Sequence, residues 1–279
     1  MNEKAKKHKK RRTATKAAAS IGPVVKEFIT GTLREREEGK NKLAYTFIVC
    51  SHEEILRAMD VVPIWTENFA GICGAKRDSE RFLQRAESLG FSRSLCTYAL
   101  CGLGFDQWRE ELEEMPPDAP WGGQARPDFM ISSGQIICDP RSKWYQAAQQ
   151  FMPDVPIYNI DLPYPLFDPK RDHREVWGYY QKYIVKQLRG LISFVEDQTG
   201  KKMDYDRLEE LVALSDRTWN LIESTYDLRA AEPCPMGTGD AMNTMVPLCF
   251  MMATQEAYDF FVQLKSELEE KIAKGEGEV

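Results

Sequence analysis

The sequence lacks the segments that would insert it into a membrane or export it. No apolar run approaches the length of a membrane span. The N-terminus is strongly basic, but no apolar core of a secretory signal follows it. The chain has seven cysteines, an odd number. Without an export signal, these observations predict a cytoplasmic protein with reduced thiols.

Nucleotide-binding motifs are also absent. Neither G-x-x-x-x-G-K-[ST] nor G-x-G-x-x-G occurs. We therefore expect any nucleotide hydrolysis that drives this protein's chemistry to belong to another chain.

The charge is unevenly distributed. The net charge is −6, yet residues 1–12 hold seven Lys and Arg against one Glu, so residues 13–279 carry −12. An acidic body argues against a general nucleic-acid-binding surface. Residues 1–19 are predicted to form a basic, disordered tail.

Apolar runs alternate with amphipathic segments between residues 20 and 165. Strands are predicted at 43–50, 61–65, 128–132 and 155–160, and helices at 20–38, 76–89, 96–114 and 141–151. A short helix after Ser51 is expected to use Ser51 as N-cap and Glu54 as its capping-box partner. The alternation predicts an α/β fold, with a parallel-sheet domain flanked by helices. A mainly helical region is expected over 166–279, with helices at 172–198, 204–228, 239–252 and 254–273.

Two cysteines lie where an iron–sulfur cluster could be held. Cys96 precedes a predicted helix and Cys138 follows a predicted strand. Thiolates are the usual protein ligands of such clusters, and a helix N-terminus favours an anionic group. The long gap between them matches no compact ligand motif such as C-x-x-C. Spacing alone therefore favours two buried free cysteines.

Six short blocks lie in order between residue 40 and residue 279. They are 45–49 with 53–58, Thr66-Glu67-Asn68, 95–98, Cys138 leading to Lys143-Trp144, 184–188 with 204–208, and 268–275. No single block is specific. The series resembles the catalytic subunits of the 2-hydroxyacyl-CoA dehydratase and benzoyl-CoA reductase superfamily. The closest likeness is to a cluster-bearing subunit of the class I, ATP-dependent benzoyl-CoA reductases.

This resemblance implies two α/β domains joined by helices, with a [4Fe-4S] cluster between them. It also implies a homologous second catalytic subunit, ATP-hydrolysing activator subunits, ferredoxin as the electron source and an acyl-CoA substrate. The expected activity is reduction of benzoyl-CoA to a cyclic dienoyl-CoA. The alternative is a radical dehydratase, in which one electron starts a ketyl-radical elimination of water from a 2-hydroxyacyl-CoA.

Carried onto this sequence, the resemblance matches Cys96 and Cys138 to the first two cluster ligands. Glu67 is a candidate to orient the thioester or move a proton, and Asn68 to bind substrate, although both could be solvated loop residues. His52 is a candidate proton donor near neutral pH, or an exposed first-turn residue. Ser51 is a candidate substrate-binding residue, and a helix cap is the simpler role.

The sequence departs from the family where a further cluster cysteine is expected, in a second α/β domain. That domain is apparently absent here, because the chain resembles only the first two thirds of a subunit. The predicted ligand set is therefore incomplete. A truncated, non-catalytic scaffold without a cluster remains a further alternative.

Overall fold

The computed structural model describes residues 15–48, 52–133, 138–163 and 172–277. The chain divides into two compact units. One comprises Lys26–Ala213, and the other comprises the two ends of the chain, Met1–Val25 and Leu214–Val279. None of the described helices combines the length and apolar character that crossing a bilayer requires.

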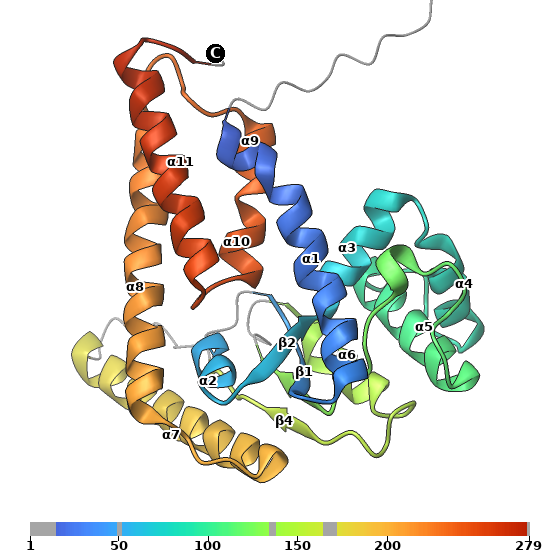
Figure 1. Cartoon of the computed structure of the whole chain (residues 1–279). Helices are drawn as coiled ribbons and strands as arrows, with labels where there is room; N and C mark the ends of the chain where they lie inside the picture. The colour runs from blue at the N-terminus through green and yellow to red at the C-terminus, as the bar shows by residue number, and fades with distance from the viewer. Residues whose placement is uncertain (1–14, 49–51, 134–137, 164–171, 278–279) are drawn as a thin grey trace, which may run out of the picture. The chain divides into compact units, whose positions relative to one another are not determined.

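The larger unit is built on a four-stranded parallel sheet (Figure 1). Its strands are β1 (Lys42–Thr46), β2 (Val61–Trp65), β3 (Phe129–Ser132) and β4 (Ile157–Asn159), in the order β2-β1-β3-β4. The predicted α/β fold with a parallel sheet is thus confirmed. The chain passes from β1 to β2 on one side and then to β3 on the other. The topological switch point therefore lies between β1 and β3, where open α/β sheets commonly bind ligands.

Alternating side chains along the strands bury both faces of the sheet. Leu43 and Tyr45 of β1 pack on one face with α5 (Thr97–Leu112) and α6 (Arg141–Ala148). Ala44 packs on the other face with α2 (Glu53–Ala58) and α7 (His173–Thr199). Buried strands of this kind explain the apolar runs in the sequence.

Two further helices, α3 (Thr66–Lys76) and α4 (Glu80–Ser88), form a smaller cluster with α5. Phe69, Phe82 and Phe105 pack there with ring centroids 4.4–6.1 Å apart. A short 3-10 helix, η1 (Pro120–Gly122), lies in the connection to β3. At Gly104 of α5, an added Cβ would lie 1.9 Å from the carbonyl oxygen of Phe82. The two helices can therefore approach this closely only because the residue is glycine.

The second unit is helical. It contains α9 (Thr238–Asn243), α10 (Met245–Phe250), α11 (Gln255–Ala273), the start of α1 (Lys16–Glu38) and the end of α8 (Tyr205–Leu228). Its core includes Ile21, Ile222, Phe261 and Leu264. Asp240 is buried and accepts a hydrogen bond from the amide of Thr15 at 2.8 Å, which ties the two ends of the chain together.

Several details differ from the sequence-based expectations. The segment Thr66-Glu67-Asn68 is the first turn of α3 instead of a loop. The N-cap of α2 is His52, and Ser51 lies outside the described residues. The predicted helix at 239–252 is two short helices that meet at Thr244.

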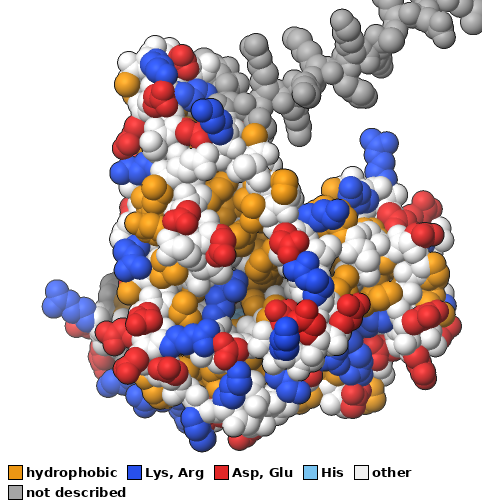
Figure 2. All heavy atoms as spheres, viewed as in Figure 1, with side chains coloured by type: hydrophobic (Ala, Val, Ile, Leu, Met, Phe, Trp, Pro, Cys, Tyr) orange, Lys and Arg blue, Asp and Glu red, His pale blue; other side chains and the backbone are white. Residues whose placement is uncertain are grey.

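The boundaries of the predicted segments differ from those of the two compact units. Helix α7, expected to belong to the helical region from residue 166, packs on the sheet and belongs to the larger unit. Residues 1–14 of the predicted tail lie outside the described residues, and residues 16–19 are helical. Acidic and basic side chains are interspersed over the face drawn in Figure 2. That face carries no broad basic surface of the kind that binds nucleic acid.

The close approach of α4 and α5 gives a first prediction. Gly104→Ala forces the added methyl group against backbone and should lower the free energy of unfolding by about 1–3 kcal/mol. The measurement is the urea midpoint of unfolding. Gly74→Ala in α3 is the matched control, because open space surrounds that position, and it should be neutral or stabilising. Equal midpoints for the two variants would contradict the packing described.

Candidate functional site

The two predicted ligand cysteines lie at the N-terminal ends of neighbouring helices. Cys96 is the N-cap of α5, and Cys138 precedes α6 by three residues, where its carbonyl accepts the amide of Arg141 at 3.1 Å. Both thiols are half-buried. Cys96 lines a cavity that Asp139 and Pro140, the residues directly after Cys138, also line. The fold therefore brings both cysteines to the carboxyl edge of the sheet, where two helix N-termini favour an anionic group.

A buried ion pair between Glu67 and Arg141 lies at this edge of the sheet. The guanidinium of Arg141 donates to both carboxylate oxygens of Glu67, at 2.9–3.1 Å. The same guanidinium donates to the carbonyl of Ile48 at 2.9 Å, and Glu67 accepts the amide of Ile48 at 2.7 Å. The side chains of Glu67 and Arg141 are only 13% and 6% exposed. This clamp joins the residues after β1 and β2 to the start of α6.

The clamp changes the interpretation of Glu67. Its carboxylate already accepts bonds from Arg141 and Ile48 and is not a solvated loop acid. Bidentate pairs of this geometry are among the stronger hydrogen-bonded contacts. Nη1 of Arg141 is buried without a hydrogen-bond partner among the described residues, and the guanidinium carbon lies 5.2 Å from the centroid of the Phe47 ring. A cation–π contact thus offsets part of the free-energy cost of burying the guanidinium charge.

His52 is buried at the start of α2. It is 1% exposed, and its Nε2 lies 2.8 Å from Oγ1 of Thr46. Burial lowers the pKa of His52 to about 4. The ring is therefore neutral near pH 7 and is poorly suited to the predicted role of proton donor. Burial acts in the opposite direction on the adjacent Glu53. It disfavours the charged carboxylate and so raises the pKa of Glu53 to about 7.

Of the two predicted substrate-binding residues, the structure describes only Asn68. Asn68 lines a cavity of about 20 Å³ with Phe28 and Trp65. That volume suffices for about one water molecule and not for an acyl group. Ser51 lies outside the described residues, so its predicted role stays a prediction.

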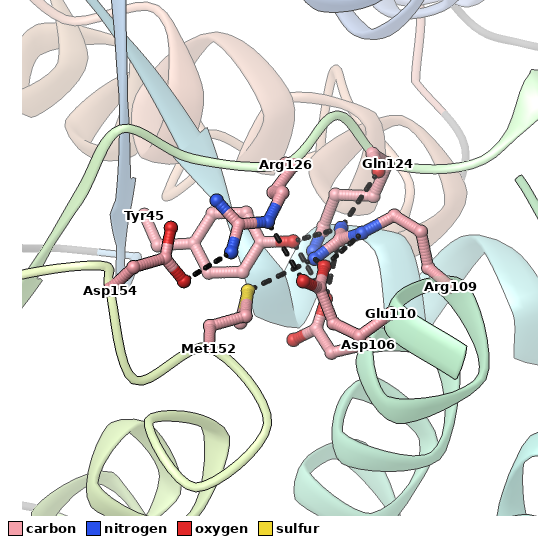
Figure 3. Close-up of polar contacts among 8 residues, drawn as sticks. All are labelled: Tyr45, Asp106, Arg109, Glu110, Gln124, Arg126, Met152 and Asp154. Carbon is pink, nitrogen blue, oxygen red and sulfur yellow. Dashed lines mark hydrogen bonds and ion pairs between the residues drawn. The ribbon is translucent and has the colours of Figure 1, made fainter. Parts of the chain in front are cut away.

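A buried polar network, not expected from the sequence, joins α5 to the sheet (Figure 3). The Tyr45 hydroxyl donates to Asp106 at 2.8 Å and accepts from Arg109 at 2.9 Å. Arg109 also bonds Glu110, which accepts from Arg126 at 2.8 Å. Burial raises the pKa of Asp106 to about 6. The only sequence signal was Asp106 and Arg109 spaced three apart on an otherwise apolar helix face, which places them side by side.

The described residues fit only part of a cluster-binding set. Cys96 and Cys138 provide two thiols, but no group of three or more His, Cys, Asp or Glu side chains in the described ranges could hold a metal ion. Iron–sulfur clusters usually take four thiolates. Cys96 and Cys138 could therefore hold at most part of the predicted cluster, and among the described residues no further ligand groups with them.

Comparison with known proteins places the chain in a family. Residues 48–279 match the family described as 2-hydroxyglutaryl-CoA dehydratase, D-component. The chain belongs to this family. The match confirms the predicted superfamily, since relatives include both dehydratase and reductase subunits.

Three relatives illustrate the range. The chain is 29% identical to the (R)-phenyllactyl-CoA dehydratase alpha subunit of Clostridium sporogenes over 80% of the chain and 51% of that subunit. It is 26% identical to the (R)-2-hydroxyisocaproyl-CoA dehydratase alpha subunit of Clostridioides difficile over 93% of the chain and 59% of that subunit. It is 23% identical to a benzoyl-CoA reductase subunit of Thauera aromatica over 91% of the chain and 57% of that subunit. The chain thus spans about half the length of the curated relatives it matches.

The clamp predicts a large loss of stability when one partner is removed. Glu67→Gln leaves the Arg141 guanidinium buried without its carboxylate and should lower the free energy of unfolding by about 3 kcal/mol. The measurement is the urea midpoint at pH 7. Glu114→Gln, at an exposed position of the same unit, is the control and should leave the midpoint unchanged. A Glu67→Gln midpoint equal to that of wild type would show that the pair contributes nothing.

Glu53 predicts a pH dependence of stability. Its pKa is raised from 4.5 to about 7 in the folded protein, so its stabilising contribution is present below about pH 4.5 and is lost as pH rises through 7. Glu53→Gln should therefore become more stable relative to wild type by roughly 3 kcal/mol between pH 4.5 and pH 8. Urea unfolding at both values measures this, since His52 titrates in both proteins and cancels. A difference that does not change with pH would contradict the burial of Glu53.

Proposed function

We propose that this chain is part of a catalytic subunit of a 2-hydroxyacyl-CoA dehydratase. The observation that carries the proposal is the family match, together with two dehydratase alpha subunits at 26–29% identity. The proposed reaction removes water from a 2-hydroxyacyl-CoA, with the hydroxyl leaving C2 and a proton leaving C3, to give an enoyl-CoA. It has no net oxidation or reduction.

The comparisons support dehydration better than the reductase activity expected from the sequence. The reductase subunit has the lowest sequence identity of the three relatives described, at 23%. No single sequence block behind that expectation is specific, so the blocks were a weak basis for separating the two reactions. Aromatic acyl-CoA reduction therefore becomes the second candidate.

Within the proposed site, Cys96 and Cys138 would hold two positions of a [4Fe-4S] cluster. When bound, such a cluster would supply single-electron transfer. The chain's own contribution is positional. The N-termini of α5 and α6 stabilise negative charge at the thiols. The Glu67–Arg141 clamp fixes the turn between Cys138 and Arg141 against the residues that follow β1.

The remaining parts of the machinery are proposed partners. They are a homologous second catalytic subunit, ATP-hydrolysing activator subunits and ferredoxin. The absence of nucleotide-binding motifs from this sequence supports a separate activator. The other ligands of the cluster would come from outside the described residues.

Iron content tests the ligand assignment. Protein purified anaerobically with its partners should contain iron and acid-labile sulfide, and Cys96→Ser and Cys138→Ser should each lose most of both. Cys234→Ser, a half-buried cysteine of the other unit, is the control and should retain them. An iron-free wild-type complex would favour the scaffold alternative instead.

Turnover separates the two reactions. The same complex, supplied with activator, ATP and reductant, should release enoyl-CoA from a 2-hydroxyacyl-CoA and should not reduce benzoyl-CoA. Reduction of benzoyl-CoA without dehydration would overturn the dehydratase proposal in favour of the reductase.

A further inference from the structure

An apolar cavity of about 250 Å³ lies beside Cys96, between the N-terminal parts of α5 and α6. Its wall on the α5 side comes from Cys96, Ala99, Leu100 and Leu103, preceded by Phe91 and Leu95. Its wall on the α6 side comes from Trp144 and Ala147, with Pro140 just before the helix. Both walls belong to the larger unit, so the cavity does not depend on the second one.

The shape of the cavity follows from how closely the two helices pack. At Gly102 of α5, an added Cβ would lie 2.4 Å from Cζ2 of Trp144. The indole therefore sits directly on the backbone of α5 and closes the floor between the helices. Ala99 and Ala147 have short side chains, which leaves open space above that floor.

The lining of the cavity is mostly apolar. Two of its residues are charged, Asp139 and Lys143, and both are exposed and of opposite sign. Burying a carboxylate among such walls without a partner is costly, whereas apolar groups gain free energy there. An apolar cavity of about 150 Å³ in another protein takes up benzene. The space beside Cys96 thus suits a branched alkyl or aryl group, and it is smaller than the pockets of about 300–1,000 Å³ that hold whole drug-sized ligands.

We propose that this cavity receives the apolar side chain of the acyl group, so that the protein acts on acyl-CoA substrates with a branched-alkyl or aryl side chain and discriminates against dicarboxylic ones. The proposal rests on the proposed function, because it takes the thioester to lie near Cys96 and Cys138. In this arrangement the side chain enters between α5 and α6, and the thioester stays at the carboxyl edge of the sheet.

Binding of acyl-CoAs that cannot lose water tests this without turnover. The complex of this chain with its partner subunits is titrated calorimetrically with 4-methylpentanoyl-CoA, acetyl-CoA and glutaryl-CoA, none of which carries a 2-hydroxyl group. Each buried methylene contributes about fourfold in affinity. The branched thioester should therefore bind at least tenfold more tightly than acetyl-CoA, and glutaryl-CoA should bind no more tightly than acetyl-CoA.

Two variants of α6 locate the effect. Ala147→Phe fills the cavity and should remove the preference for the branched thioester over acetyl-CoA. Gln146→Phe places the same ring at the exposed neighbouring position, outside the lining, and should keep the preference. Equal affinities for the three thioesters in wild type, or a preference that survives Ala147→Phe, would overturn the proposal. So would weakened subunit association in Ala147→Phe with unchanged thioester binding, because a protein segment would then fill the cavity.

The outcomes also distinguish this inference from the proposed function. A chain-length preference in a complex that never dehydrates a 2-hydroxyacyl-CoA keeps the cavity assignment and overturns the dehydratase. Dehydration by a complex that binds all three thioesters equally keeps the dehydratase and overturns the cavity assignment.

Discussion

The ion pair between Glu67 and Arg141 is the contact on which the carboxyl edge of the sheet depends. It connects three segments that are far apart in the sequence: the residues after β1, the first turn of α3 and the first residue of α6. A buried pair of this kind adds little net stability compared with apolar packing, but removal of one partner is costly. Its contribution is therefore geometric, since it holds the backbone on either side of the switch point in one arrangement.

The second constraint is the close packing of α5 on its neighbours. Gly104 allows the backbone of α4 to approach, and Gly102 allows the indole of Trp144 to lie against the helix. The Tyr45–Asp106–Arg109 network then ties α5 to β1. Together these contacts fix the direction of α5 and, with it, the position of Cys96 at its N-terminus. The placement of Cys96 near the turn that follows Cys138 is therefore a consequence of how α5 packs on its neighbours.

The sequence predicted the parts of this structure that local pattern determines. The strand at 61–65 was predicted to the residue, because it is an apolar run bounded by polar residues. The helix predicted at 204–228 is α8, which begins at Tyr205, and the side chain of the preceding Asp204 accepts the amide of Arg207 at 3.0 Å. Cys138 and Glu67 follow strands β3 and β2 of the parallel sheet and therefore lie at its carboxyl edge.

The sequence could not show which side chains that are distant in the sequence contact each other in the folded protein. The sequence left Glu67 as either a catalytic candidate or a solvated loop acid, because Arg141, its partner, lies 74 positions away. His52 looked like an exposed first-turn residue, and only the tertiary packing shows that it is buried beside Thr46. Helix α3 was missed because Gly71 and Gly74 weaken its helical pattern, and packing of Phe69 and Cys73 against α4 and α5 stabilises it.

The amide of Ile48 reports most directly on whether this edge is built as described, because it donates to the carboxylate of Glu67. Its hydrogen exchange can be followed by NMR in the full chain under native conditions. The account predicts exchange as slow as that of the β1 amides, although Ile48 lies beyond the last residue of the strand. Exchange at the rate of an exposed loop amide would show that the clamp between β1, α3 and α6 is not formed, and would remove the structural basis for placing the functional site there.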